Sequence, residues 1–124
     1  MILVDSSGWI EYFVDGPLAG RYAAHIEGTQ EVLVPTIVLY EVYKKITRDA
    51  GERPAIDAIA NMKKGITVPL SERLALAASA YSLQHKLPMA DAIIYATAQA
   101  ERAKVITSDE HFKGLPGVEF IERG

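Results

Sequence analysis

Four acidic side chains are the residues of this chain whose type and position could do chemistry. Asp5 and Asp109 each follow a short, mostly apolar run. Glu41 interrupts a longer apolar segment, and Asp91 lies between two others. A charge among apolar neighbours is costly unless something compensates it. One divalent cation compensates all four together, because Mg²⁺ and Mn²⁺ prefer oxygen ligands. A metal cluster of this kind can hydrolyse phosphodiesters.

Each acid also has an ordinary structural explanation. Asp5 could cap a following helix, but Ser6 and Ser7 can do so too, which leaves Asp5 free for other work. Glu41 could form an i,i+4 pair with Lys45, which is worth only about 0.3 kcal/mol.

The remaining two acids have similar alternatives. Asp91 could complement the dipole of a helix, and Asp109 could be a helix N-cap. Four separate explanations are less economical than one shared site, so the combination favours a metal centre.

Other catalytic arrangements are weaker in this sequence. His25, His85 and His111 stand in no metal-ligand spacing, and a catalytic histidine is not expected, although His111 is the first candidate because it neighbours Asp109. The chain has neither a nucleophile-elbow serine motif nor a phosphate-binding glycine-lysine loop.

Length and composition predict one globular domain over residues 1–124. Hydrophobic residues make up 49% of the chain, which is enough for a packed core. The sequence has no cysteine, no run of the ~20 apolar residues that a membrane span needs, and no basic segment ahead of its first apolar run. We therefore expect a cytoplasmic protein without a membrane anchor.

The net charge alone argues against a nucleic-acid partner, because it is −3, with 13 basic against 16 acidic residues. A bound cation would offset the acids locally. Basic side chains also cluster at Lys44, Lys45 and Arg48 and at Lys63 and Lys64, although each cluster could be an ordinary solvated helix face.

Short β-rich runs alternate with helical segments along the chain. The expected strands are 2–4, 32–34, 66–68, 105–107 and 118–121. The expected helices are about 6–13, 18–27, 36–49, 54–64, 72–86 and 88–102, with a short turn after Asp109. We expect Thr36 to cap the third helix and Ser71 the fifth. The strands read as covered on both faces.

This alternation predicts an α/β fold with a central parallel sheet of about five strands and helices on both faces. Asp5 and Asp109 then lie just beyond the carboxyl ends of two strands, where open α/β sheets bind ligands. Asp91 falls in the first turn of one helix and Glu41 in the second turn of another. All four acids could therefore face one edge of the sheet.

Four short motifs in this order resemble those of PIN-domain ribonucleases, specifically VapC-type toxins of toxin–antitoxin pairs. The matching segments are Val4–Phe13, Pro35–Val42, Ala90–Ala96 and Thr107–Phe112. The first motif often reads Asp-Thr-Ser; this chain has Ser6 in the middle and keeps the hydroxyl at Ser7.

The resemblance implies a PIN-like α/β/α sandwich and Mg²⁺- or Mn²⁺-dependent endoribonuclease activity. It also implies a homodimer and inhibition by a cognate antitoxin protein. Residues 9–13 of the first helix and the helix carrying Tyr40 and Tyr43 hold more apolar groups than a small core can bury. Apolar surface left exposed in this way would suit a groove that binds a partner protein.

Our hypothesis assigns the divalent ion to Asp5 and Asp91, with Asp109 completing the site. Glu41 orients or deprotonates the attacking water, and Ser7 and Thr107 hydrogen-bond the carboxylates. Without metal, such crowded carboxylates should repel one another or be partly protonated.

Three alternatives stay open. The same carboxylates could serve a metal-dependent phosphatase or a DNA nuclease. A degenerate domain could bind RNA or protein without cutting. A response-regulator-like fold would also have an acidic pocket, but it needs adjacent acids after the first strand, where this chain has Ser6 after Asp5.

Overall fold

A five-stranded sheet forms the centre of the computed structural model, which describes residues 1–123, and all of its neighbouring strands are parallel. The strands are β1 (Ile2–Val4), β2 (Val32–Pro35), β3 (Ile66–Val68), β4 (Lys104–Thr107) and β5 (Val118–Phe120). Their order in the sheet is β3-β2-β1-β4-β5. The predicted α/β class with a parallel sheet of five strands is confirmed.

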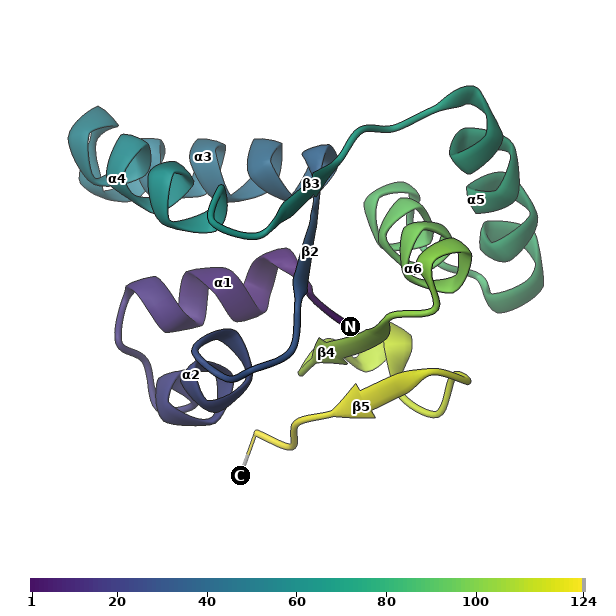
Figure 1. Cartoon of the computed structure of the whole chain (residues 1–124). Helices are drawn as coiled ribbons and strands as arrows, with labels where there is room; N and C mark the ends of the chain where they lie inside the picture. Colours follow the sequence, from purple (N-terminus) through teal and green to yellow (C-terminus); the bar gives the residue numbers. More distant parts are fainter. Residues whose placement is uncertain (124) are drawn as a thin grey trace.

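The connecting helices cover both sides of the sheet. They are α1 (Ser6–Phe13), α2 (Ala19–Ile26), α3 (Thr36–Ala50), α4 (Glu52–Met62), α5 (Glu72–His85) and α6 (Met89–Glu101), and a 3₁₀ turn, η1 (Glu110–Phe112), follows β4. Figure 1 shows α1 and α2 on one side of the strands and α5 and α6 on the other. Right-handed crossovers require this division, because the chain moves from β1 outward to β3 and then returns to β4 beyond β1.

The return of the chain creates a topological switch point between β1 and β4. These two strands pair in parallel, with Val4 opposite Ile106. Connections leave β1 and β4 toward opposite edges of the sheet, and open α/β sheets bind ligands beyond the carboxyl ends of strands at such a point. Asp5 follows β1 directly, and Asp109 lies two residues beyond β4.

Burial differs between the central and the edge strands. Every residue of β1 and β2 is buried, as are the last three residues of β4. The edge strand β3 is largely exposed, and Ile66 is 42% accessible. The prediction that the strands are covered on both faces is therefore right for β1 and β2 and wrong for β3, and the other edge strand, β5, is only partly buried.

The helices begin close to the predicted positions, but only one of the two predicted N-caps of α3 and α5 is observed. Ser71 caps α5 by accepting a hydrogen bond from Leu74 N at 3.1 Å. The N-cap of α3 is Pro35 rather than Thr36, so that prediction is wrong. Thr36 Oγ1 instead accepts a hydrogen bond from Leu70 N at 3.3 Å, because β2 and the segment after β3 run side by side.

Among residues 1–123, none of the helices combines the length and the apolar character that crossing a membrane requires.

Candidate metal centre

Asp5 forms the buried base of the site and is only 2% exposed. Gly8 N donates a hydrogen bond to its Oδ1 at 3.0 Å, which makes Asp5 the N-cap of α1. The prediction that Ser6 or Ser7 caps this helix and leaves Asp5 free is therefore wrong. The cap occupies only Oδ1, and Oδ2 accepts from Ser7 Oγ at 2.9 Å and from Thr107 Oγ1 at 2.8 Å. Three donors thus fix the orientation of one carboxylate.

Burial raises the pKa of Asp5 from 3.8 to about 6. Hydrogen bonds from Thr107, Gly8 and Ser7 favour the charged form and lower the pKa, whereas the nearby charge of Asp109 raises it. Desolvation outweighs the three hydrogen bonds. The metal-free carboxylate is therefore held in an unfavourable state that a cation would relieve.

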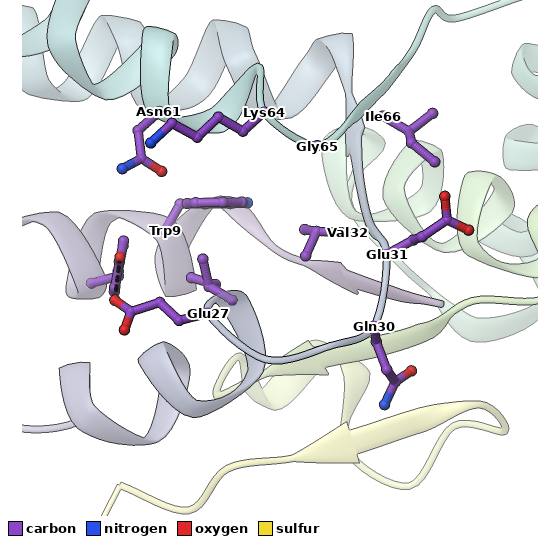
Figure 2. A pocket seen from close by; sticks show the side chains of 11 residues that line it. Trp9, Glu27, Gln30, Glu31, Val32, Asn61, Lys64, Gly65 and Ile66 are labelled. Atoms are coloured by element: carbon purple, nitrogen blue, oxygen red, sulfur yellow. Dashed lines mark hydrogen bonds between the residues drawn. The ribbon is translucent and has the colours of Figure 1, made fainter.

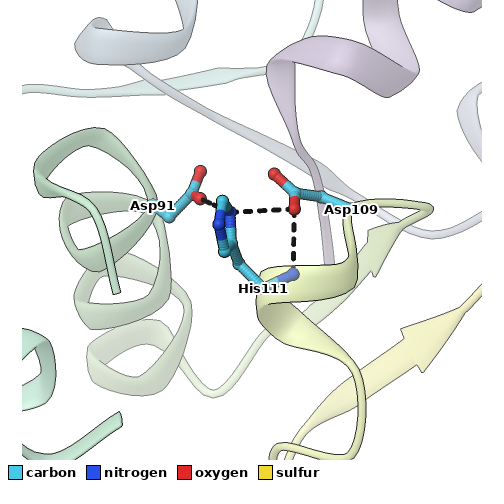
Figure 3. Close-up of side chains that lie close together, drawn as sticks. All are labelled: Asp91, Asp109 and His111. Carbon is cyan, nitrogen blue, oxygen red and sulfur yellow. Dashed lines mark hydrogen bonds and ion pairs between the residues drawn. The ribbon is translucent and has the colours of Figure 1, made fainter. Parts of the chain in front are cut away.

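Asp91, Asp109 and His111 form a cluster at the same end of the sheet (Figure 3). His111 Nδ1 lies 3.0 Å from Asp91 Oδ2 and 3.0 Å from Asp109 Oδ1. One ligand atom from each of these residues lies within 4.8 Å of the other two. Two carboxylate oxygens and one imidazole nitrogen are a donor set that a divalent cation can use.

Local structure positions each member of the cluster. Asp91 lies in the first turn of α6, whose N-cap is Pro88. Asp109 caps η1 by accepting from His111 N at 2.9 Å. Thr107 Oγ1 accepts from Asp109 N at 2.9 Å while it donates to Asp5, so one threonine links the carboxylate base to the cluster.

Burial also raises the pKa of Asp91 from 3.8 to about 6. The charges of Asp109 and, to a smaller degree, Asp5 raise it further, whereas the charge and hydrogen bond of His111 lower it. The three aspartates therefore lie close enough to affect one another electrostatically. The structure brings Asp5, Asp91 and Asp109 together, from segments up to about a hundred residues apart.

Glu41 lies in the second turn of α3, the helix that begins at the carboxyl end of β2 beside β1. The alternative pairing with Lys45 is not formed, because Lys45 Nζ bonds Asp49 Oδ2 at 3.0 Å instead. Glu41 Oε1 is buried, and within residues 1–123 it has no hydrogen-bond partner. A buried acceptor without a donor is unfavourable, so Glu41 has capacity for a cation or water. Among residues 1–123, Glu41 is not part of the group formed by Asp91, Asp109 and His111, and its role stays a prediction.

His111 is the member of the cluster that sequence reasoning did not assign to the metal. A signal was present, since His111 follows Asp109 by two residues after a strand. The pairing with Asp91, however, depends on how α6 packs beside β4, and no local pattern encodes that.

Exposure increases outward from the base of the site. Asp5 is buried, whereas the side chains of Asp91, Asp109 and His111 are 16%, 29% and 55% exposed. Carboxylate oxygens that are partly exposed to solvent fit a hard divalent cation that also contacts a bulky substrate. The residues present therefore fit the predicted Mg²⁺ or Mn²⁺ ion.

Two cavities among the described residues are lined by other parts of the chain. One, of about 370 Å³, is lined by Trp9, Lys64 and neighbouring residues at the amino ends of β2 and β3, at the opposite edge of the sheet (Figure 2). The second, of about 440 Å³, lies between α1, α3 and α4. None of the acidic residues of the cluster lines either of these two cavities.

Comparison with known proteins gives one family and several similar structures. The model of the PIN domain family matches residues 2–118. No curated protein sequence matches the chain.

The similar solved structures span nearly the whole chain. A toxin–antitoxin complex from Klebsiella pneumoniae contains a chain 27% identical, with a TM-score of 0.83, covering 98% of this chain and 99% of that one. VapC20 of Mycobacterium tuberculosis, described as a toxin that cleaves the sarcin–ricin loop, is 19% identical, with a TM-score of 0.72 and coverage of 84% and 85%. VapBC2 from Rickettsia felis, bound to a DNA fragment from its promoter, is 13% identical, with a TM-score of 0.75 and 98% coverage of both chains. The last two identities establish similarity of fold alone.

Proposed function

This chain belongs to the PIN domain family, and we propose that it is a divalent-metal-dependent endoribonuclease, the toxin of a VapBC-type toxin–antitoxin pair. One observation carries the proposal: ligand atoms of Asp91 and Asp109 lie within 4.8 Å of each other, and Thr107 links Asp109 to Asp5 at the switch point of the sheet. Nucleic-acid hydrolysis needs negative oxygens that hold metal next to an accessible surface, and the partly exposed carboxylates of Asp91 and Asp109 meet both needs. The described similarity to toxin–antitoxin structures supports the toxin assignment.

The three aspartates have different roles in the proposed site. Asp5 and Asp91 hold the ion, and Asp109 completes or extends the site. Ser7 and Thr107 keep Asp5 oriented through their hydrogen bonds, so the carboxylate need not reorganise during the reaction. When bound, Mg²⁺ or Mn²⁺ supplies positive charge for the phosphoryl oxygens and makes the attacking water more acidic.

Glu41 is the proposed general base. Its buried Oε1 has no hydrogen-bond partner within residues 1–123, so it is able to accept a proton from the attacking water or to orient that water. The side chain of Asp109 is 29% exposed, so it is accessible to the phosphate that is cut.

RNA is the proposed substrate because the site is open and because one similar fold is that of a toxin that cleaves the sarcin–ricin loop. The basic side chains of α3 attract RNA less strongly than their number suggests. Lys45 and Arg48 both bond Asp49, each at 3.0 Å, which offsets part of their charge. The metal centre is therefore the main electrostatic attraction for phosphate in this proposal.

A cognate antitoxin is the proposed protein partner, and a groove of this structure supports it. The cavity of about 440 Å³ between α1, α3 and α4 is lined by apolar side chains that include Ile10, Phe13 and Ile46. Trp9 is buried, but Tyr43 is 38% exposed, so the apolar surplus is not absorbed by the core. The apolar face of an antitoxin helix suits such a groove.

We also propose a homodimer. Large apolar side chains are exposed on or beside α5 and α6, namely Leu76, Leu83 and Met89. Light scattering on the purified chain, alone and with its antitoxin, tests the dimer.

The deciding experiment measures cleavage of single-stranded RNA by the wild type, Asp5→Asn and Asp91→Asn, each with Mg²⁺ or Mn²⁺. Asp57→Asn is the matched control, because Asp57 is exposed and its ion pair within residues 1–123 is with Arg53 on the same helix. We expect both site variants to lose cleavage and the control to keep it. Full activity in a site variant, or undiminished cleavage in excess chelator, removes the metal role.

The same assay separates the alternatives. Parallel reactions with single-stranded DNA and with a small phosphomonoester distinguish a DNA nuclease or a phosphatase. Binding of RNA or of a protein partner without any cleavage identifies a non-catalytic module.

A further inference from the structure

The imidazole of His111 lies between two carboxylates of the proposed metal centre, facing the side chains of both (Figure 3). Its Nδ1 is 3.0 Å from Asp91 Oδ2 and 3.0 Å from Asp109 Oδ1. Asp109 Oδ1 already accepts a hydrogen bond from the backbone N–H of His111. One ring N–H cannot be aimed well at two acceptors, so hydrogen bonding accounts for only one of the two short approaches.

The same spacing suits atoms that share a cation. Neighbouring ligands of an octahedral ion with bonds of about 2.1 Å lie roughly 3.0 Å apart. Both Nδ1-to-oxygen distances have this value. His111 therefore needs little movement to become a ligand beside the two aspartates.

The backbone holds His111 in this position. Asp109 caps η1 through the N–H of His111, and the next residue, Phe112, is fully buried in the core. The turn is thus anchored on both sides of His111, although the imidazole itself is 55% exposed. A ligand on an anchored turn loses little conformational freedom when it binds metal.

We propose that His111 is a direct ligand, through Nδ1, of the divalent ion held by Asp91 and Asp109, and that it makes this site prefer Mn²⁺ over Mg²⁺. The inference rests on the proposed metal centre and adds a ligand and a metal preference to it. Imidazole nitrogen suits first-row transition metals, whereas Mg²⁺ keeps to oxygen ligands and water.

The test uses electron spin-echo spectroscopy of Mn²⁺ bound to the full chain, which detects nitrogen bonded to the ion. His111→Ala removes the imidazole, and His111→Asn keeps a hydrogen-bond donor without a comparable nitrogen ligand. His25→Ala is the matched control, because His25 is also paired with a carboxylate, Glu119 at 2.9 Å, on another part of the surface. Circular dichroism verifies that each variant is folded.

We expect imidazole nitrogen coupling in the wild type and in His25→Ala and its loss in both His111 variants. Titrations should show Mn²⁺ affinity falling at least about tenfold in His111→Asn, with a smaller change for Mg²⁺. Bound Mn²⁺ without nitrogen coupling in the wild type, or an unchanged ratio of Mn²⁺ to Mg²⁺ affinity in His111→Asn, overturns the proposal. Failure of the wild type to bind Mn²⁺ overturns it as well.

RNA cleavage measured on the same samples keeps this inference separate from the proposed function. Metal-dependent cleavage without nitrogen coupling refutes the role of His111 and leaves the nuclease proposal standing. Nitrogen coupling without cleavage of RNA supports the ligand and refutes the nuclease.

Discussion

Replacing Asp5 with asparagine is expected to stabilise the metal-free protein at pH 7.5 by about 1–2 kcal/mol, while abolishing RNA cleavage. Burial raises the pKa of Asp5 from 3.8 to about 6. A shift of that size costs the ionised folded state about 3 kcal/mol, at about 1.4 kcal/mol per pKa unit. Asp5 is 2% exposed, so solvent does little to screen this cost.

Asparagine recovers only part of that energy. Its oxygen keeps the hydrogen bond from Gly8 N, but its amide group replaces the Oδ2 that accepts from Ser7 and Thr107. Both hydroxyls must then turn to accept hydrogen bonds. Rearrangement of two bonds costs about 1–2 kcal/mol, which leaves the net gain given above.

The gain depends on pH in a defined direction. Because the folded pKa of Asp5 is above 3.8, the wild-type folded state binds the proton more tightly than the unfolded state does. The contribution of Asp5 to wild-type stability therefore falls as pH rises from about 3.8 to about 6 and is constant above that. Asparagine does not titrate, so its advantage should shrink by about 2 kcal/mol between pH 7.5 and pH 4.5.

Urea unfolding in chelator at pH 4.5 and pH 7.5 measures both quantities. The control Asp57→Asn should stay within about 0.5 kcal/mol of the wild type at both pH values, because Asp57 is on the surface. If Asp5→Asn is less stable than the wild type at pH 7.5, or if its difference does not change with pH, the argument from buried charge is refuted.

Three further changes test the structure around the site. Thr107→Val removes the hydroxyl that donates to Asp5 and should lower the free energy of unfolding by about 1–3 kcal/mol in urea; a neutral result would contradict its linking role. Gly8→Ala should lower the free energy of unfolding by about 1–3 kcal/mol, and with it the melting temperature, because the added Cβ would lie 2.5 Å from Tyr22 Cε1. Tyr22→Phe breaks the buried 2.7 Å bond to Ser108 and should cost about 1 kcal/mol with cleavage unchanged; lost cleavage would place Tyr22 in the chemistry.

The raised pKa values of two aspartates show that their ionised forms lower the stability of the metal-free fold. Burial raises the pKa of Asp5 and of Asp91 to about 6, and the charge of a neighbouring aspartate contributes to both shifts. Fold stability alone would favour neutral side chains here. Chemistry that needs a cation supplies the opposing reason.

Local sequence patterns were sufficient to predict the positions of the helices and strands. Apolar runs bounded by glycine, proline and capping residues place all five strands and six helices within a few residues of their observed bounds. These signals act over a few residues, because strand and helix periodicity is a property of the nearby chain. The alternation of the elements also predicts the parallel sheet, because parallel strands need crossover connections.

Local sequence patterns did not predict which residue caps α1. Aspartate and serine are about equally good N-caps, so the sequence alone does not distinguish Asp5 from Ser6 or Ser7. In the folded chain, Oδ1 of Asp5 caps the helix, and Thr107, 102 positions away, donates a hydrogen bond to Oδ2 of the same carboxylate.

The composition of the proposed metal centre was likewise divided between sequence and tertiary structure. The sequence by itself determined which carboxylates stand at the ends of strands and in the first turns of helices. Only the tertiary structure decided that the chain returns to β4 beside β1, that α6 packs so that Asp91 faces Asp109, and that His111 lies between them. Those distances depend on packing between segments far apart in the chain, and packing is a property of the whole core rather than of any local pattern.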